Sequence, residues 1–464
     1  MKKSAKEMFA DTDVHITTHG KRHLGAALGS KTFTEEYVND KVQRWTKDII
    51  NLAQVASSQP HAAYAAYGHG LSSRWSYLLR TVPDIDDLLQ PLENAIHQHL
   101  IPALTGQPPC SSIVRDLLAL PVRLGGLGLR DPSATSSDSF QSSERITAPL
   151  VALIISQDTD ESVDPDTTST IKKEVKKRNR QRQDEQAQIV YDQLTPELKR
   201  CADLSKEKGS SSWLSVLPLE EHGFYLHKGE FRDALCLRYG WKPNSIPQTC
   251  NCGVQFTVNH AMICHMGGFP TIRHNEIRDI TASLLTEVCN NVATEPLLQP
   301  LSGESMTARS ANTDDGARSD IRARGFWNVS QDAFFDVRVF YPNASSNCST
   351  DLSSVYRRHE QAKKREYGQR IREVERGVFT PLVLSTTGGM GREAITFFKR
   401  LADMIAQKRQ HPYPTVMGWL RCRLSFASLR ASIMCIRGSR SSFHRPIYGS
   451  DITLATYEGR IPSV

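Results

Sequence analysis

The segment ARSDIRARGFWNVSQDAFFDVRVF, residues 317–340, predicts two short strands joined by a turn. Asp320 stands at the head of the first strand and Asp336 inside the second. In a hairpin the two carboxylates converge at one end of the sheet, which is the oxygen-rich, anionic corner that Mg²⁺ needs. Because AFFDVRVF is otherwise apolar, a buried Asp336 must be metal-bound or paired, and an ion pair with Arg338 or another arginine is the competing interpretation.

Helices and strands alternate on both sides of this hairpin. Amphipathic helices are predicted at 274–292 and 392–410, a strongly charged helix at 354–377 and a basic amphipathic helix at 419–438. Additional strands are predicted at TEPLLQPL (294–301) and FTPLVLSTTGG (379–389). The pattern predicts an α/β region over the C-terminal half.

The charged helix carries Glu360, Lys363, Lys364 and Tyr367. A spacing of three to four residues places Glu360 beside the two lysines on one helix face. Two interpretations stay open. The helix is a solvent-exposed, salt-bridged surface, or a lysine and Tyr367 approach a phosphate near the two aspartates.

A cluster of cysteines precedes the α/β region. Cys250 and Cys252 are followed by His260 and Cys264, with His265 adjacent. Three thiols and one imidazole within so short a segment predict a structural, four-ligand Zn²⁺ site, with His265 as a substitute for Cys264. The alternative is a chance group of small buried thiols.

The N-terminal half has mostly helical patterning. The segment FTEEYVNDKVQRWTKDIINLAQVA (33–56) repeats apolar residues at helical spacing, with Thr34 as its expected N-cap. Residues 133–170 are rich in Ser, Thr and Asp around the apolar patch APLVALII, which predicts a flexible connection containing a short buried segment. A basic run follows, and it is either a solvated helix face or a phosphate-backbone contact. Its cations are Lys172, Lys173, Lys176, Lys177, Arg178, Arg180 and Arg182.

The bulk composition is compatible with these predictions. The 464 residues carry a net charge of +7, which suits a polyanionic partner without requiring one. No apolar run is long enough to span a membrane, and no apolar stretch follows the lysines at the N-terminus as in a secretory signal peptide. We therefore expect multi-domain α+β architecture, no membrane association and no disulfides.

Several of these features, taken in order, resemble the C-terminal part of a LINE-type non-LTR retrotransposon polyprotein. GKRHLGAALGS (20–30) resembles the segment that closes a reverse-transcriptase palm, and the helices with LPVRLGGLGLRDP (120–132) resemble the thumb. The cysteine cluster resembles the family's zinc knuckle, and the segment from His274 resembles its PD-(D/E)XK restriction-endonuclease-like domain. The domains implied are a palm end (1–30), a thumb-like region (31–132), a flexible connection (133–170), a helical basic linker (171–245), a zinc knuckle (246–268), a nuclease-like domain (269–440) and a tail (441–464).

The resemblance also implies site residues. Glu276, with Asp279 as competitor, matches the acidic residue of the first helix, and Asp320 matches the first strand. Asp336-Val337-Arg338 matches the (D/E)-x-K element, with arginine where the family has lysine. Arginine cannot act as a general base, so Lys363 or Lys364 is expected to replace the missing lysine, with Tyr367 beside the site.

The function implied is a nuclear, Mg²⁺- or Mn²⁺-dependent DNA endonuclease that nicks target DNA to prime reverse transcription, with DNA and element RNA as partners. The Tyr-x-Asp-Asp turn of a polymerase is absent from the sequence, so no polymerase activity is expected. Two alternatives remain: a nucleic-acid-binding module that does not cleave, and a non-functional relic of a degraded element. The target sequence and the oligomeric state do not follow from the sequence.

Overall fold

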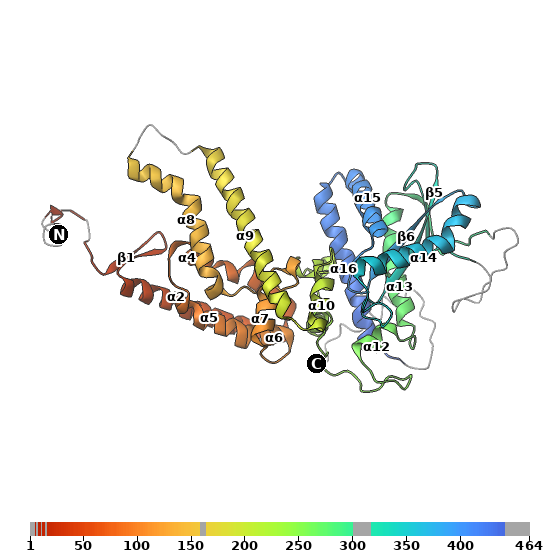
Figure 1. Ribbon diagram of the computed structural model, residues 1–464, viewed down its shortest axis with the longest axis horizontal. Helices are drawn as coiled ribbons and strands as arrows, with labels where there is room; N and C mark the ends of the chain where they lie inside the picture. Colours follow the sequence, from red (N-terminus) through yellow and green to blue (C-terminus); the bar gives the residue numbers. More distant parts are fainter. Residues whose placement is uncertain are drawn as a thin grey trace. The chain divides into compact units, whose positions relative to one another are not determined.

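The computed structural model describes residues 16–157, 164–299 and 317–440, together with a few positions before residue 16 (Figure 1). The chain divides into two compact units, Met1–Trp241 and Lys242–Val464. The first is mostly helical and the second combines helices with a mixed sheet, which confirms the predicted fold class. The predicted tail, 441–464, lies outside the described residues.

The first unit begins with a hairpin and continues as helices. Strands β1 (Gly20–His23) and β2 (Ala26–Gly29) pair antiparallel. Ser30, and not the predicted Thr34, caps the next helix, because its side chain accepts a hydrogen bond of 3.2 Å from the amide of Phe33. The helices of this unit are α2 (Lys31–Ser58), α3 (Pro60–His69), α4 (Ser76–Thr81), α5 (Gln90–Ala95), α6 (Ile101–Thr105), α7 (Ser112–Ala119), α8 (Pro132–Ser156), α9 (Pro165–Gln193), α10 (Pro196–Lys206) and α11 (Lys228–Tyr239).

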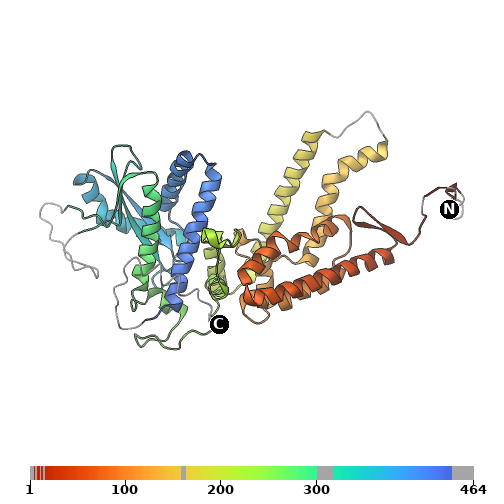
Figure 2. The same cartoon turned by 180° about the vertical axis from the view of Figure 1, so that it is seen from behind.

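Helix α8 corrects one expectation. Residues 133–156, predicted to be flexible, belong to this helix, which Asp131 caps at its start through the amides of Ser133 and Ala134. The patch APLVALII was expected to be buried, yet Ile154 is 67% and Ile155 75% exposed. Serine and threonine are only weak helix formers, so composition alone predicted a loop, while the Asp-Pro start and the N-cap favour a helix. Figures 1 and 2 show α8 and α9 diverging toward the segment between them.

The second unit is built on a four-stranded sheet with strand order β3-β4-β5-β6. Strands β3 (Asn290–Thr294), β4 (Ile321–Arg324) and β5 (Asp332–Phe340) pair antiparallel. Strand β6 (Val378–Ser385) pairs parallel with β5, and helix α14 (Leu352–Glu373) makes the crossover between them. The strand predicted at 294–301 is wrong within the described residues, since β3 ends at Thr294 and only an isolated bridge follows, at Leu297.

Helices cover both faces of this sheet. Phe335 and Val337 of β5 pack into a large core with α13 (Phe269–Thr286), α15 (Arg392–Arg409) and α16 (Tyr413–Arg437). Phe334 and Phe340 point to the opposite face, where α14 contributes Ile371, Val355 and Tyr356. Side chains alternate along a strand, so Asp336 lies on the α14 face between these two aromatic residues.

The cysteine cluster belongs to the second unit and contains the short helix α12 (Val258–Ile263). Arg440 links it to α16, because its guanidinium donates to the carbonyls of Ala261 and Cys435. None of the helices in the described ranges is long and apolar enough to cross a membrane.

Candidate active site and zinc cluster

Asp320 immediately precedes β4 and lies opposite Asp336 of the neighbouring strand β5. The antiparallel register pairs Ile321 with Phe335, which sets the preceding Asp320 across from Asp336 on the same face of the sheet. One oxygen of Asp320, Oδ2, accepts a 2.6 Å hydrogen bond from the backbone amide of Val337. The predicted convergence of the two carboxylates is therefore a property of the strand register.

Lys363 of α14 reaches the acid pair from the next helix. Its Nζ lies 3.0 Å from Asp336 Oδ2, within ion-pair distance, and 3.5 Å from Glu366 Oε2. The ammonium forms an ion pair with Asp336, and beyond it Oδ2 has no hydrogen-bond partner among the described residues. Burial, followed by the charge of Asp320, raises the pKa of Asp336 to about 7, although Lys363 and His274 act in the opposite direction.

His274 is a site residue that sequence reasoning did not single out. It lies on α13, and its Nε2 is 3.1 Å from Asp320 Oδ1. Residues two positions apart in a helix differ by about 200° in their direction around the helix axis, so His274 and Glu276 cannot both face the sheet. No local signal distinguishes them, because the partner of His274 is 46 residues away in the chain.

Glu276, the predicted first-helix acid, lies away from the acid pair. Burial raises its pKa, and the charges that act on it are those of Asp279, Arg430 and Arg423. The two arginines belong to α16, so Glu276 faces the helical layer. Among the described residues, no hydrogen bond or ion pair involves Glu276 and either site aspartate.

Neither Lys364 nor Arg338 forms the ion pair with Asp336 that Lys363 forms. Lys364 Nζ is 2.5 Å from Glu393 Oε1, in a partly exposed ion pair at the start of α15. Arg338 is exposed on β5, two residues beyond Asp336. The ion pair between Asp336 and Arg338 that sequence analysis left open is absent from the described residues, and Lys363 takes that place.

Tyr367 and Glu360 complete the surroundings of Lys363. The Tyr367 ring centroid is 5.1 Å from Lys363 Nζ, and burial, then Asp336 and Glu366, raise the pKa of the phenol, so it stays protonated. Glu360 accepts a 3.0 Å hydrogen bond from the amide of Glu393 and thereby anchors α14 to the start of α15. Lys363 is thus presented by a helix that is anchored at Glu360, one turn before it, and packed along its length.

The acid pair has the donor chemistry for a hard divalent cation. It offers two carboxylates, one of them only 3% exposed and carrying an oxygen whose described partner is the Lys363 ammonium. Lys363 compensates only part of the cost of ionising this buried carboxylate, since the pKa of Asp336 is still raised, and a further cation would favour the ionised form. Asp320 and Asp336 would hold Mg²⁺ or Mn²⁺, ions that favour oxygen ligands.

The cysteine cluster brings its four predicted ligands together. The ligand atoms of Cys250, Cys252, His260 and Cys264 lie within 4.8 Å of one another. Cys250 Sγ is 3.8 Å from Cys264 Sγ, and Cys252 Sγ is 3.3 Å from His260 Nε2. A Zn–S bond of about 2.3 Å gives a tetrahedral edge of about 3.8 Å, so this group can bind Zn²⁺.

Local structure sets this geometry. A tight turn through Gly253, at φ 86°, brings Cys250 and Cys252 to one side, with the Cys250 amide donating to the Val254 carbonyl at 2.9 Å. Thr257 caps α12 by accepting from the His260 amide at 3.1 Å, and Cys264 follows the helix. His265 is exposed and is not part of the group, so Cys264 is the fourth ligand candidate.

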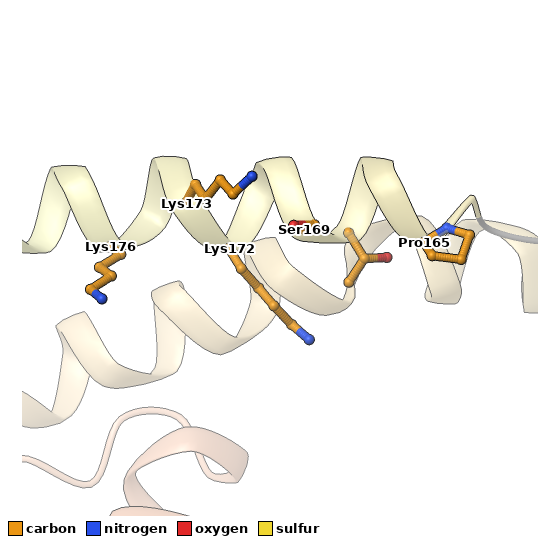
Figure 3. Close-up of a pocket in the computed structure, with 6 residues that line it drawn as sticks. Pro165, Ser169, Lys172, Lys173 and Lys176 are labelled. Carbon is orange, nitrogen blue, oxygen red and sulfur yellow. The ribbon is translucent and has the colours of Figure 1, made fainter. Parts of the chain in front are cut away.

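The predicted nucleic-acid-binding residues lie on α9. Lys172 and Lys176 extend from the same side of the helix, over an open hollow that also involves Ser169 (Figure 3). Arg182 differs from the others because it forms an ion pair with Asp138 of α8. The exposed cations of the run are Lys172, Lys173, Lys176, Lys177, Arg178 and Arg180.

No protein-family model matches the chain, and no curated protein matches it. The geometry described above is therefore the basis for a functional assignment.

Proposed function

We propose that the second unit is a Mg²⁺-dependent DNA endonuclease, and that the chain derives from the C-terminal part of a LINE-type retrotransposon polyprotein. Its role in that setting is to nick target DNA in the nucleus so that the nick primes reverse transcription. DNA is the substrate and element RNA a further partner. The chain itself contributes no polymerase activity, since no Tyr-x-Asp-Asp turn is found in the sequence.

The observation that carries this proposal is the position of Lys363. Its ammonium lies 3.0 Å from Asp336, and Asp336 lies across the strand pair from Asp320. Two carboxylates and a lysine on one sheet face are the groups that metal-dependent phosphodiester hydrolysis requires. The lysine that the (D/E)-x-K element lacks at Arg338 is thus available from α14.

Each residue has a role in the proposed reaction. When bound by Asp320 and Asp336, the divalent ion supplies an acidified water and charge neutralisation at the scissile phosphate. Lys363 stabilises the negative charge that develops on that phosphate. His274 and the Val337 amide orient the Asp320 carboxylate, and Tyr367 stays protonated as a hydrogen-bond donor near Lys363.

A second candidate function is nucleic-acid binding without cleavage. The exposed cations of α9 favour it, because phosphate contacts by lysine and arginine supply sequence-independent affinity. This function requires neither the carboxylates nor Lys363. The two candidates therefore differ in whether Asp336 matters.

Nicking of supercoiled plasmid by the full chain tests the proposal. We expect Mg²⁺ or Mn²⁺ to support nicking, Ca²⁺ to support none, and Asp336→Asn to lower the rate by at least about a hundredfold. Asp332→Asn is the matched control, since Asp332 is at the start of the same strand, four residues away.

The outcomes separate the two candidates. Equal rates for wild type and Asp336→Asn, or no nicking by wild type with any metal, would reject the endonuclease. If wild type binds plasmid without nicking it, and affinity falls steeply with salt, the binding function replaces it.

A further inference from the structure

Arg338 is an exposed cation on an otherwise buried strand. Residues 333–337 of β5 are buried, and Arg338 is the one exposed position of the strand. No hydrogen bond or ion pair to its guanidinium is formed by the described part of the chain. An arginine carries its charge at all relevant pH values, so this side chain is available to an external anion.

The strand pleat relates Arg338 directly to the acid pair. Residues two apart on a strand share a face, so Arg338 and Asp336 both lie on the α14 side of the sheet. Their separation along the strand is about 6.6 Å, from a rise of about 3.3 Å per residue. This backbone separation is comparable to the step between neighbouring phosphates of one nucleic-acid strand.

The surroundings of Arg338 include cationic and neutral side chains, and Asp336 is an anion on the same face of the sheet. Burial, followed by the charges of Arg338 and Arg358, lowers the pKa of His359 to about 4, so this imidazole is neutral at neutral pH. The charge of Arg338 also lowers the pKa of buried Arg273, after the larger effect of burial. Among the described residues Asp336 forms its ion pair with Lys363 and not with Arg338, whereas Arg358 donates to the Ser346 carbonyl and the Asn347 side chain.

We infer that Arg338 holds the phosphate adjacent to the scissile one, so that the bound nucleic-acid strand crosses the acid pair along β5. The inference rests on the proposed endonuclease function. A guanidinium binds a phosphate through two parallel hydrogen bonds, which fixes the position of the strand as well as attracting it. Arg338 is thus a positioning residue, and the lysine function belongs to Lys363.

The slope of log Kd against log salt concentration reports how many phosphates the protein contacts. For the full chain on a short DNA duplex in Ca²⁺, we expect Arg338→Gln to weaken binding about tenfold and to reduce the slope of log Kd against log salt by about 0.9. Arg338→Lys should keep the slope, because it keeps the charge. Arg324→Gln is the matched control, an exposed arginine at the opposite end of the hairpin on β4, and it should leave the slope unchanged.

Steady-state nicking in Mg²⁺ provides a second readout. Arg338→Gln should raise KM about tenfold while changing kcat little, since the contact forms in the ground state as well as the transition state. An unchanged slope and KM in Arg338→Gln, or an equal loss in Arg324→Gln, would overturn the inference. If the slope changes but wild type does not nick, the phosphate contact stands and the endonuclease function fails.

Discussion

The zinc cluster and the acid pair are both candidate metal sites of the second unit, yet they are assembled in different ways. All four candidate zinc ligands come from the fifteen-residue segment 250–264 and are set by one turn and one short helix. The acid site combines residues of α13, β5 and α14 with Asp320 at the start of β4. Three of the four strands of the sheet, β3, β4 and β5, lie between His274 and Lys363 in the sequence.

This difference determines how each site depends on the rest of the molecule. The zinc ligands are close in the chain, so local conformation is enough to gather them once the metal binds. The acid pair depends on strand register and on the packing of α14, and a one-residue slip would turn Asp336 to the opposite face. Substitution of a zinc ligand and substitution of an acid-pair residue should therefore have different measurable effects on the protein.

Loss of zinc has the largest expected effect. Wild type should contain about one zinc per chain by elemental analysis, and Cys264→Ser should lose it and lower the stability of the second unit by several kcal/mol, because metal binding is coupled to folding. Cys348→Ser, an exposed cysteine outside the cluster, is the control and should keep the metal. Zinc-free wild type, or equal loss in both variants, would contradict the assignment.

Removal of one charge from the acid pair should act on Mn²⁺ and leave the fold intact. Asp320→Asn keeps an oxygen acceptor for the Val337 amide but loses the anionic ligand. We expect Mn²⁺ affinity, measured by electron paramagnetic resonance on zinc-loaded protein, to fall by about 10- to 100-fold. Asp332→Asn should bind Mn²⁺ as wild type does. Unchanged affinity in Asp320→Asn would mean that the cation binds elsewhere.

Glu276→Gln tests whether Glu276 belongs to the active site, as the resemblance implied. Glu276 faces Arg423 and Arg430 of α16, so its substitution should change the nicking rate by no more than about twofold, as for residues outside the site. His274→Gln, which removes a partner of Asp320, should reduce the rate more. A larger loss in Glu276→Gln than in His274→Gln would restore Glu276 as the first-helix site residue.

His359 should make a small, pH-dependent contribution to stability. Its pKa falls from 6.5 to about 4 on folding, so the folded protein binds fewer protons between these values. The stability contributed by neutral His359 is present above pH 6.5 and is lost as pH falls toward 4. Because the side chain is partly exposed, the effect is smaller than the full shift would give. Urea unfolding at pH 7 and pH 5 should show wild type losing more stability than His359→Gln; equal losses would contradict this.

Part of this structure was predictable from local sequence. Alternating and apolar patterns located β4, β5 and β6, and the Cys-His spacing located the zinc ligands, since both signals depend on near neighbours. Helix α8 was not predicted, because its serines and threonines resemble a linker and its apolar patch is exposed. Composition does not reveal which helices leave their apolar residues exposed instead of packing them into a core.

The acid site was predictable only in part. Asp320 and Asp336 could be paired by assuming a hairpin, but the choice between Lys363 and Lys364 depends on the rotation of α14 about its axis. That rotation is set by tertiary contacts, with Val355 and Ile371 buried against the sheet and Glu360 held at α15. The pairing of His274 with Asp320 depends on how α13 packs, and no local pattern encodes it.

The central claim is that Lys363 of α14 completes a metal-dependent hydrolytic site with Asp320 and Asp336. Its most direct test is single-turnover nicking by Lys363→Met and Lys364→Met, adjacent substitutions of the same residue type on the same helix. We expect Lys363→Met to lower the rate by about a hundredfold or more and Lys364→Met by less than about threefold, because only Lys363 lies at the acid pair. Equal rates in the two variants, or a larger loss in Lys364→Met, would contradict the account.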